Sequence, residues 1–211
     1  MAEKGLLIVL SGFSGVGKGT IVKELLTRYP EEFSLSISAT SRKMREGEED
    51  GKHYFFVSRE EFQKMIDEEK LLEYAVYNDN FYGTPKDYVL SEMEKGKNVI
   101  LEIEVQGGLQ IKKIFPESLL LYVVPPSAEE LYERLKGRGT ETLSEIKRRL
   151  RRAVVEADYV PQYDQLIVND DLGRCVEDVT ALIRKAQRQA DEENRLIARL
   201  KKELVEITKE D

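Results

Sequence analysis

A glycine-rich segment near the N-terminus constrains the fold of this chain more than any other feature. It follows a continuous apolar run, Leu6–Leu10, precedes a segment of helical periodicity, Thr20–Arg28, and reads Gly12-Phe13-Ser14-Gly15-Val16-Gly17-Lys18-Gly19-Thr20. Glycines allow successive backbone N–H groups to turn inward, and the start of a helix adds partial positive charge. An ordinary glycine turn also fits the spacing, but the position between a strand and a helix favours a phosphate-binding loop. Lys18 would then reach the terminal phosphates of a nucleoside triphosphate.

The rest of the chain alternates apolar runs with segments of helical periodicity. Three further runs are mostly continuous, as in strands buried on both faces: Val99–Leu101, Leu119–Val124 and Leu166–Val168. Helical segments separate these runs, so βαβ crossovers and a parallel sheet are expected. The segment 34–84 differs, because short strand-like pieces surround one helical stretch, Arg59–Glu69. We therefore predict an α/β fold with a small antiparallel insertion.

Composition limits the class of protein. The 211 residues are 41% hydrophobic and 35% charged and carry a formal net charge of −7, which fits one charge-rich domain and argues against broad nucleic-acid binding. No apolar run approaches the ~18 residues of a membrane span, and no signal peptide is evident. The single cysteine, Cys175, excludes an internal disulfide framework, so we expect a cytoplasmic protein with no membrane partner. The residues from Val176 to Ile207 predict a long charged amphipathic helix, continuous or broken.

A second group of anion-binding residue types lies in the insertion. Arg42 and Arg45 stand three residues apart in a loop without apolar periodicity, and Tyr54 and Tyr82 follow. Guanidinium groups offer planar pairs of donors, and tyrosine hydroxyls add neutral donors, which together suit a phosphate. Most arginine-rich loops are simply exposed to solvent. Two arginines alone therefore do not distinguish a phosphate-binding site from a solvated charged loop.

Taken together, the motifs of this chain resemble those of guanylate kinase over about residues 5–183. Beside the glycine-rich loop, the resemblance rests on the following segments in order: Ser38-Ala39-Thr40-Ser41-Arg42 with Arg45 and Gly47, Tyr54-Phe55-Phe56, Glu73, Tyr82-Gly83-Thr84, Leu101–Gly107, Pro125-Pro126-Ser127, Gly137–Glu141 and Ile167–Asp170. It implies transfer of the γ-phosphate of MgATP to GMP, with dGMP as a further acceptor. It also implies three parts: a parallel-sheet P-loop core (5–33, 85–127 and 158–211), a GMP-binding insertion (34–84) and a mobile lid (128–157).

The resemblance assigns the insertion to GMP. Four residues would hold the GMP phosphate: Arg42, Arg45, Tyr54 and Tyr82. Four would read the guanine: Ser38, Glu73, Thr84 and Glu104. The chemistry fits Glu73, because N1–H and N2–H₂ of guanine are adjacent donors that one carboxylate can accept. Adenine lacks this donor pair and would leave a buried carboxylate unpaired.

The same resemblance assigns ATP to the loop from Gly12 to Thr20, with Asn169 beside the adenine. Three lid arginines would contact the phosphates during transfer: Arg134, Arg138 and Arg149. Lys18, Arg42 and these three arginines form the implied catalytic set. No cluster of residues indicates direct metal ligation, so Mg²⁺ would arrive with ATP, keep several waters, and lie near Thr20 and Glu102.

Two other functions fit parts of this pattern. Guanylate-kinase-like modules of scaffolding proteins bind phosphopeptides without catalysis, but they typically lose the lysine-bearing loop, which this chain keeps. A kinase for another nucleoside monophosphate is disfavoured by Glu73 together with Ser38. We therefore expect an active enzyme that binds ATP and GMP as substrates and that is a monomer or a homodimer.

Overall fold

The computed structural model describes residues 4–77, 79–137, 139 and 142–208. A five-stranded sheet forms the centre of the molecule, and its strands are ordered β2-β7-β1-β8-β9. Every neighbouring pair in this sheet is parallel. The strands are β1 (Leu7–Gly12), β2 (Phe33–Leu35), β7 (Asn98–Glu102), β8 (Leu119–Val124) and β9 (Gln165–Val168). The predicted α/β fold with a parallel sheet is thus confirmed.

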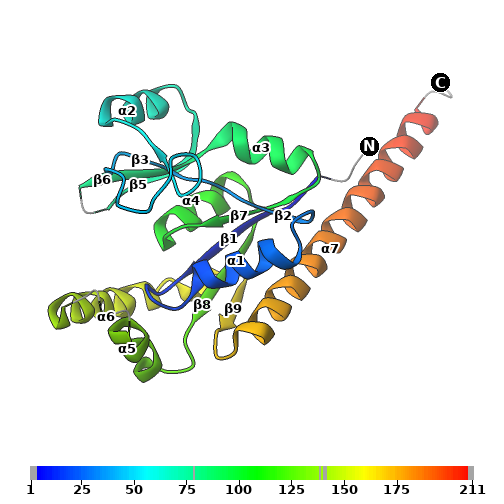
Figure 1. The fold of residues 1–211 in the computed structure, drawn as a ribbon. Coiled ribbons are helices and arrows are strands. Elements are labelled where there is room, and N and C mark those ends of the chain that lie inside the picture. Colours follow the sequence, from blue (N-terminus) through cyan, green and yellow to red (C-terminus); the bar gives the residue numbers. More distant parts are fainter. Residues whose placement is uncertain (1–3, 78, 138, 140–141, 209–211) are drawn as a thin grey trace.

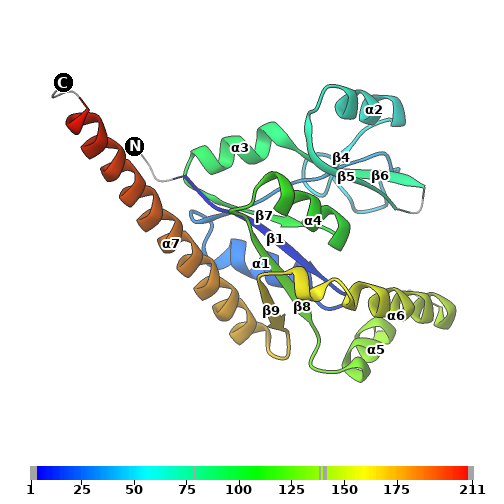
Figure 2. The same ribbon diagram turned by 180° about the vertical axis from the view of Figure 1, so that it is seen from behind.

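Helices cover both faces of this sheet, which explains why its strands are apolar without alternation. Ile8 and Leu10 of β1 pack in one core cluster with α1 (Lys18–Arg28) and α7 (Leu172–Ile207). Leu7 and Val9 point the other way and pack with α3 (Lys86–Glu94) and α4 (Val105–Ile114). Helices α1 and α7 face the viewer in Figure 1, and α4 faces the viewer in Figure 2.

The insertion forms a second sheet of four strands, in the order β4-β3-β6-β5. Its elements are β3 (Ala39–Thr40), β4 (Phe55–Phe56), α2 (Arg59–Asp67), β5 (Leu71–Tyr77) and β6 (Asn80–Pro85). The pairs β3–β6 and β5–β6 are antiparallel, as predicted, but β3 and β4 are parallel. The expectation of a wholly antiparallel insertion is therefore wrong for this pair, because the long connection from Ser41 to Tyr54 lets the chain return in the same direction. Residues 34 and 35, at the start of the predicted insertion, lie in β2 of the central sheet.

The segment 128–157 consists of α5 (Ala128–Gly137) and α6 (Leu143–Ala157). These two helices share a small core of their own, which includes Leu131, Leu135 and Ile146 and touches Phe13 of the glycine-rich loop. Thr142 and Glu145 form a reciprocal capping box that fixes the start of α6. In Figure 1 the pair lies below the sheet, on the side opposite the insertion. A short 3₁₀ helix, η1 (Val160–Gln162), connects α6 to β9.

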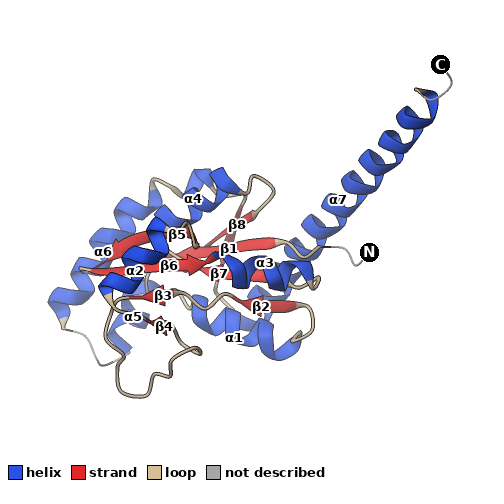
Figure 3. Ribbon diagram, turned by 90° about the horizontal axis from the view of Figure 1, so that it is seen from above, coloured by secondary structure: helices blue, strands red, loops and turns tan. Residues whose placement is uncertain are grey.

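The C-terminal helix α7 is one unbroken element of 36 residues. It begins at Leu172, earlier than the predicted start at Val176, because the Asp171 side chain accepts a hydrogen bond from the Arg174 amide and caps the helix. Its first part packs on the sheet, and its second part projects away from the body (Figure 3). Among the described residues, no helix is both long enough and apolar enough to span a bilayer.

Candidate active site

The glycine-rich loop joins the end of β1 to the start of α1, which is the position predicted from the sequence. Gly15 and Gly17 adopt left-handed backbone conformations, with φ angles of 92° and 100°. A Cβ atom on Gly17 would stand 2.7 Å from Asn169 Nδ2, so conformation and space both require glycine there. Gly17 has no side chain to cap α1, and the first amides of the helix keep their capacity to bind an anion.

The ammonium group of Lys18 bends back over this loop. Its Nζ atom donates to the backbone oxygen atoms of Gly12, at 2.7 Å, and of Phe13, at 3.4 Å. Both acceptors are neutral, so the positive charge of Lys18 is not cancelled by these contacts. The loop therefore combines backbone donors with one full positive charge, as a site for a polyphosphate requires.

Asn169 and Arg134 hold the glycine-rich loop in place through the backbone oxygen of Val16. Asn169 Nδ2 donates to the backbone oxygen of Val16 at 2.8 Å, and the residue is only 7% exposed. Arg134 donates to the same Val16 oxygen at 3.2 Å and to the backbone oxygen of Asn169 at 2.9 Å. Glu130 accepts from Arg134 Nε at 2.8 Å and orients the guanidinium. Sequence reasoning named Asn169 and Arg134 for ligand contact and did not foresee that they position the loop.

Helix α6, which lies in the predicted lid, also contacts the loop. Arg149 Nη1 donates to Ser14 Oγ at 2.7 Å. Its neighbour Arg148 is exposed to solvent, as expected for adjacent residues that point in different directions on a helix. Arg138, the third predicted lid arginine, lies outside the described residues.

In the insertion, Arg42 is held by a carboxylate that sequence reasoning missed. Arg42 Nη1 and Nη2 donate to the two oxygen atoms of Glu48 at 2.9 and 2.8 Å, in a bidentate pair. The Arg45 amide donates to the same carboxylate at 2.7 Å, while the Arg45 side chain is exposed. The guanidinium of Arg42, followed by the Arg45 amide, lowers the pKa of Glu48 to about 2, so this carboxylate stays charged. No periodicity or spacing in the sequence marks Glu48 as the partner of Arg42.

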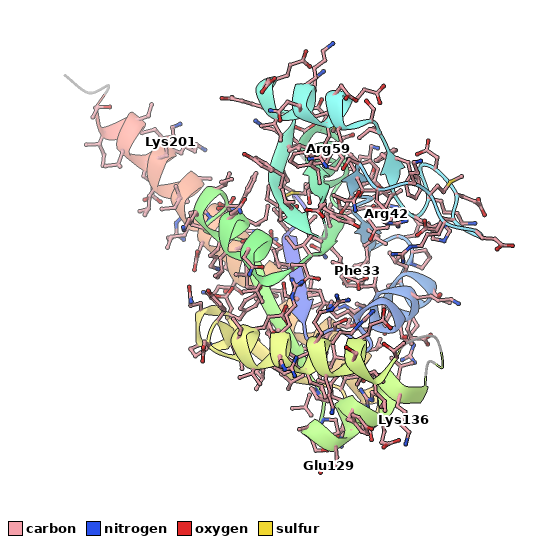
Figure 4. All side chains as sticks on the ribbon, turned by 90° about the vertical axis from the view of Figure 1, so that its left-hand side faces the viewer. Phe33, Arg42, Arg59, Glu129, Lys136 and Lys201 are labelled. Atoms are coloured by element: carbon pink, nitrogen blue, oxygen red, sulfur yellow. The ribbon has the colours of Figure 1, made fainter. Side chains whose placement is uncertain are left out.

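Two tyrosines stand beside Arg42. The guanidinium carbon lies 5.3 Å from the ring centroid of Tyr54, and the rings of Tyr54 and Tyr82 contact edge to face at 5.9 Å. Burial raises the pKa of Tyr54, so its hydroxyl remains a neutral donor. Arg42, Tyr54 and Tyr82 are thus brought together as predicted. Figure 4 shows Arg42 on the insertion, above Lys136 and Glu129 on helix α5 of the predicted lid.

A buried carboxylate lies at the junction of the insertion with the core. Glu73 on β5 is 6% exposed, and its Oε1 accepts from the hydroxyl of the fully buried Thr84 at 2.6 Å. Burial raises the pKa of Glu73, and the bond from Thr84 opposes this shift. A Cβ atom on Gly107 of α4 would stand 2.6 Å from Glu73 Oε2, so only glycine leaves room for this carboxylate. Ser38 is half-buried immediately before β3, and its backbone oxygen accepts from the Phe55 amide.

Glu104 is hydrogen-bonded to a side chain of α6. Arg152 of α6 donates to Glu104 Oε2 at 2.8 Å and to Glu156 Oε1 at 2.7 Å. Glu156 is 4% exposed, and its pKa is raised by burial although Arg152 opposes the shift. Arg152 thus connects α6 to the segment that follows β7 in the core.

Glu102 lies beside the first turn of α1, and Thr20 belongs to that turn. A Cβ atom on Gly19 would stand 3.6 Å from Glu102 Oε2, and Thr20 is exposed. The Glu102 side chain reaches solvent, yet surrounding protein atoms raise its pKa, whereas the charge of Lys18 lowers it. No group of three or more His, Cys, Asp or Glu side chains within the described part of the chain is arranged to hold a metal ion. One carboxylate and one hydroxyl fit Mg²⁺ that is carried by a nucleotide and keeps its waters.

Comparison with known proteins agrees with this geometry. The family model described as guanylate kinase matches residues 4–186. A guanylate kinase of Caldanaerobacter subterraneus subsp. tengcongensis is 47% identical over 203 residues, which cover 96% of this chain and 98% of the relative. One of Bacillus cereus is 52% identical over 182 residues, with 86% and 89% covered.

A solved structure is similar as well. The crystal structure of guanylate kinase from Anaplasma phagocytophilum superposes with a TM-score of 0.71 at 30% identity, and the match covers 88% of this chain and 87% of that one. The match to the family model spans most of the chain, and the relatives are aligned over nearly their whole length. The chain therefore belongs to the guanylate kinase family and has guanylate kinase activity.

Proposed function

We propose that ATP binds the glycine-rich loop, that GMP binds the insertion, and that the γ-phosphoryl group of MgATP passes directly to the phosphate of GMP. The observation that carries this proposal is that one short segment, 102–107, contacts both proposed sites. A Cβ atom on Gly19, in the first turn of α1, would stand 3.6 Å from Glu102 Oε2, and a Cβ atom on Gly107 would stand 2.6 Å from Glu73 Oε2 in the insertion. Nucleotides bound at the two sites would therefore lie on either side of this segment, close to each other.

For ATP, the backbone amides of residues 15–20 would bind the phosphates, and Lys18 would stabilise the β- and γ-phosphoryl oxygens. Arg149 already contacts Ser14 in the loop, so its guanidinium is near the proposed phosphate position. Arg138 is proposed as a second lid cation, and Arg134 as the residue that shapes the loop through Val16. Asn169 would lie beside the adenine.

For GMP, four residues would bind the phosphate: Arg42, Arg45, Tyr54 and Tyr82. Glu48 would hold the guanidinium of Arg42 in one orientation, which lowers the conformational entropy lost on binding. Glu73 would accept from N1–H and N2–H₂ of guanine, with Ser38, Thr84 and Glu104 as further contacts. Glu104 would have to exchange its bond with Arg152 for a bond with the base.

Mg²⁺ would be held mainly by the phosphates of ATP and by water, with Glu102 and Thr20 as the nearest protein oxygens. When bound, it would supply positive charge that neutralises the phosphate oxygens and orients the γ-phosphoryl group. The residues of this chain would promote transfer by positioning the two nucleotides and by supplying positive charge.

The transfer itself needs no general base from the protein. The nucleophile is a phosphate oxygen of GMP that is already ionised, the new bond forms between this oxygen and the γ-phosphorus, and the bond from the γ-phosphorus to the β-phosphate oxygen breaks. Lys18 and the lid arginines would stabilise charge on the transferring oxygens. Closure of α5 and α6 over the site would exclude water, which would otherwise hydrolyse ATP.

A panel of nucleotides tests this proposal. With MgATP as donor, a coupled assay should show fast turnover with GMP, measurable turnover with dGMP, and little with AMP, CMP or UMP. A preference for another base would overturn the assignment of Glu73, and GMP binding without turnover would favour a binding module.

The buried thiol of Cys175 is compatible with the reducing conditions of a cytoplasm, where we propose that the enzyme acts.

A further inference from the structure

One face of helix α6 contacts two different parts of the core. Arg149, Arg152 and Glu156 are separated by three and four residues, so they follow one another along this face. Arg149 Nη1 donates to Ser14 Oγ in the glycine-rich loop at 2.7 Å. Arg152 Nη2 donates to Glu104 Oε2, beside the proposed guanine site, at 2.8 Å. Figures 1 and 2 show that α6 lies nearer to the insertion than α5 does.

A buried carboxylate holds Arg152 in this position. The Nε atom of Arg152 donates to Glu156 Oε1 at 2.7 Å, and Glu156 is only 4% exposed. Burial raises the pKa of Glu156, the bond from Arg152 opposes this shift, and the nearby charge of Glu104 adds to it. Arg152 and Glu156 belong to one helix, so this pair moves with α6, whereas the bond to Glu104 ties the helix to the core.

Glu104 belongs to the segment that forms one wall of the proposed guanine site. It precedes α4, and Gly107, three residues later, leaves the room that the Glu73 carboxylate occupies. Unlike Glu73, Glu104 is exposed, so its carboxylate is accessible to a ligand. A carboxylate that faces both N1 and N2 of guanine accepts one hydrogen from each nitrogen. Glu73 would therefore leave the second N2–H without an acceptor, and Glu104 offers one.

We propose that Arg152 is a positioning residue that couples recognition of the guanine base to the position of Arg149. This coupling rests on the proposed binding of guanine at Glu73 and Glu104. The N2 amino group of GMP and the guanidinium of Arg152 both donate to Glu104, so they compete for its carboxylate. When GMP binds, Arg152 leaves Glu104 and the tie between α6 and the core is lost. Arg149, about one turn earlier on the same face, then moves with the helix toward the phosphates.

Affinity for GMP tests the competition, because loss of a positive charge would otherwise weaken the binding of an anion. Arg152→Ala should lower the Kd of GMP by about twofold to fivefold, the factor typical of a partly exposed ion pair. The Kd of inosine monophosphate, which lacks the N2 amino group, should not change. Arg151→Ala, at an exposed position of the same helix, is the matched control and should bind both nucleotides as wild type does.

Titration calorimetry measures these four pairs of protein and nucleotide, together with both nucleotides on the wild type. Weaker or unchanged binding of GMP to the Arg152→Ala protein would overturn the proposal. Equal tightening for GMP and inosine monophosphate would also overturn it, because the competition would then not involve the N2 amino group.

Hydrogen exchange tests whether the helix is released. In the wild type, the amides of α6 should exchange faster after GMP is added, because the tie from Arg152 to Glu104 is broken. In Arg152→Ala they should exchange at the faster rate with and without GMP. If GMP left the exchange of α6 in the wild type unchanged, the base would not be coupled to this helix.

A second variant keeps the test valid if Arg152→Ala does not fold, since that change takes a guanidinium away from the buried Glu156. The double variant Arg152→Ala with Glu156→Gln removes the buried charge as well and should show the same tightening of GMP. If GMP binding were weakened by Glu73→Gln but not strengthened in either Arg152 variant, the coupling would be refuted and the proposed GMP site would stand. If Glu73→Gln had no effect on GMP, the proposed site would be refuted and the coupling with it.

Discussion

The two proposed phosphate sites differ in what holds their cations. In the glycine-rich loop, Lys18 donates to neutral backbone oxygens, and most of the remaining donors are amides whose positions are set by β1 and α1. In the insertion, Arg42 is paired with the carboxylate of Glu48 and stands beside two tyrosine rings. The first site is thus built mainly from backbone, and the second from side chains.

This difference predicts different failures on mutation. A backbone site keeps its shape when a side chain is removed, so loss of Lys18 should affect the transfer step more than the folding of the loop. A site built from side chains depends on every contact between them. Loss of the Glu48 carboxylate should therefore change the orientation of Arg42 and should weaken binding of the acceptor phosphate.

Lys18→Ala should lower kcat by at least about 100-fold, because the positive charge acts on oxygens that gain charge during transfer. Affinity for GMP should remain nearly unchanged. Steady-state kinetics and calorimetric titration with GMP measure both quantities. Lys23→Ala, on the exposed face of the same helix, is the control and should behave as wild type. An equal loss of GMP affinity would show that the two sites are not separate.

Glu73→Gln should weaken GMP binding by about 1–3 kcal/mol, or roughly 5- to 150-fold, because an amide cannot accept from both guanine donors and leaves one of them unpaired. Binding of ATP should not change. Glu60→Gln, an exposed position of the insertion, serves as the control. A folded Glu73→Gln protein with wild-type affinity for GMP would place the guanine contact elsewhere.

Glu48→Gln should raise KM for GMP by roughly threefold to tenfold, a change of about 1 kcal/mol, because Arg42 loses the charge that orients it. The value of kcat should change little, and KM for ATP should stay constant. Kinetics with each substrate varied in turn provide the measurement. A rise in KM for ATP of the same size would mean that Glu48 acts on the whole molecule and not on the insertion alone.

Acidification should weaken GMP binding by a few fold, because burial raises the pKa of Glu73 above its ordinary value of 4.5 and the protonated acid accepts poorly. Acidification should have the opposite effect on the stability of the folded protein. The folded protein holds this proton at a pH where the unfolded chain has lost it, so the contribution of Glu73 to stability falls as pH rises through the raised pKa. Profiles of kcat/KM for GMP and of Tm against pH, for wild type and Glu73→Gln, check both statements. If the variant kept the wild-type profiles, Glu73 would not be the titrating group.

Long, strongly patterned elements could be predicted from the sequence. Continuous apolar runs predict the parallel strands β1, β7 and β8, and the glycine pattern predicts the loop before α1, because these signals are local. The strands β3 and β4 have two residues each and show no period, so their parallel pairing could not be derived. Their arrangement depends on the connection between them and on the packing of the insertion.

The partners of site residues were the least predictable feature. Arg42, Tyr54, Tyr82 and Glu73 were named from motifs, but Glu48 was not, since a carboxylate in a charge-rich loop carries no distinguishing pattern. Gly107 was noted as part of a motif, and its role in making room for Glu73 required coordinates. Likewise, the hydrogen bond from Arg152 to Glu104 joins residues that are 48 positions apart in the chain. Such contacts are set by tertiary packing and not by local sequence.

A crystal structure with GMP and a non-hydrolysable ATP analogue bound together tests the central claim most directly. We expect the GMP phosphate to contact Arg42 and Tyr54, and the phosphates of the analogue to lie on the amides of the glycine-rich loop beside Lys18. The γ-phosphorus should face a GMP phosphate oxygen in line for transfer. A GMP phosphate bound away from Arg42, or out of line with the γ-phosphorus, would contradict direct transfer between the two proposed sites.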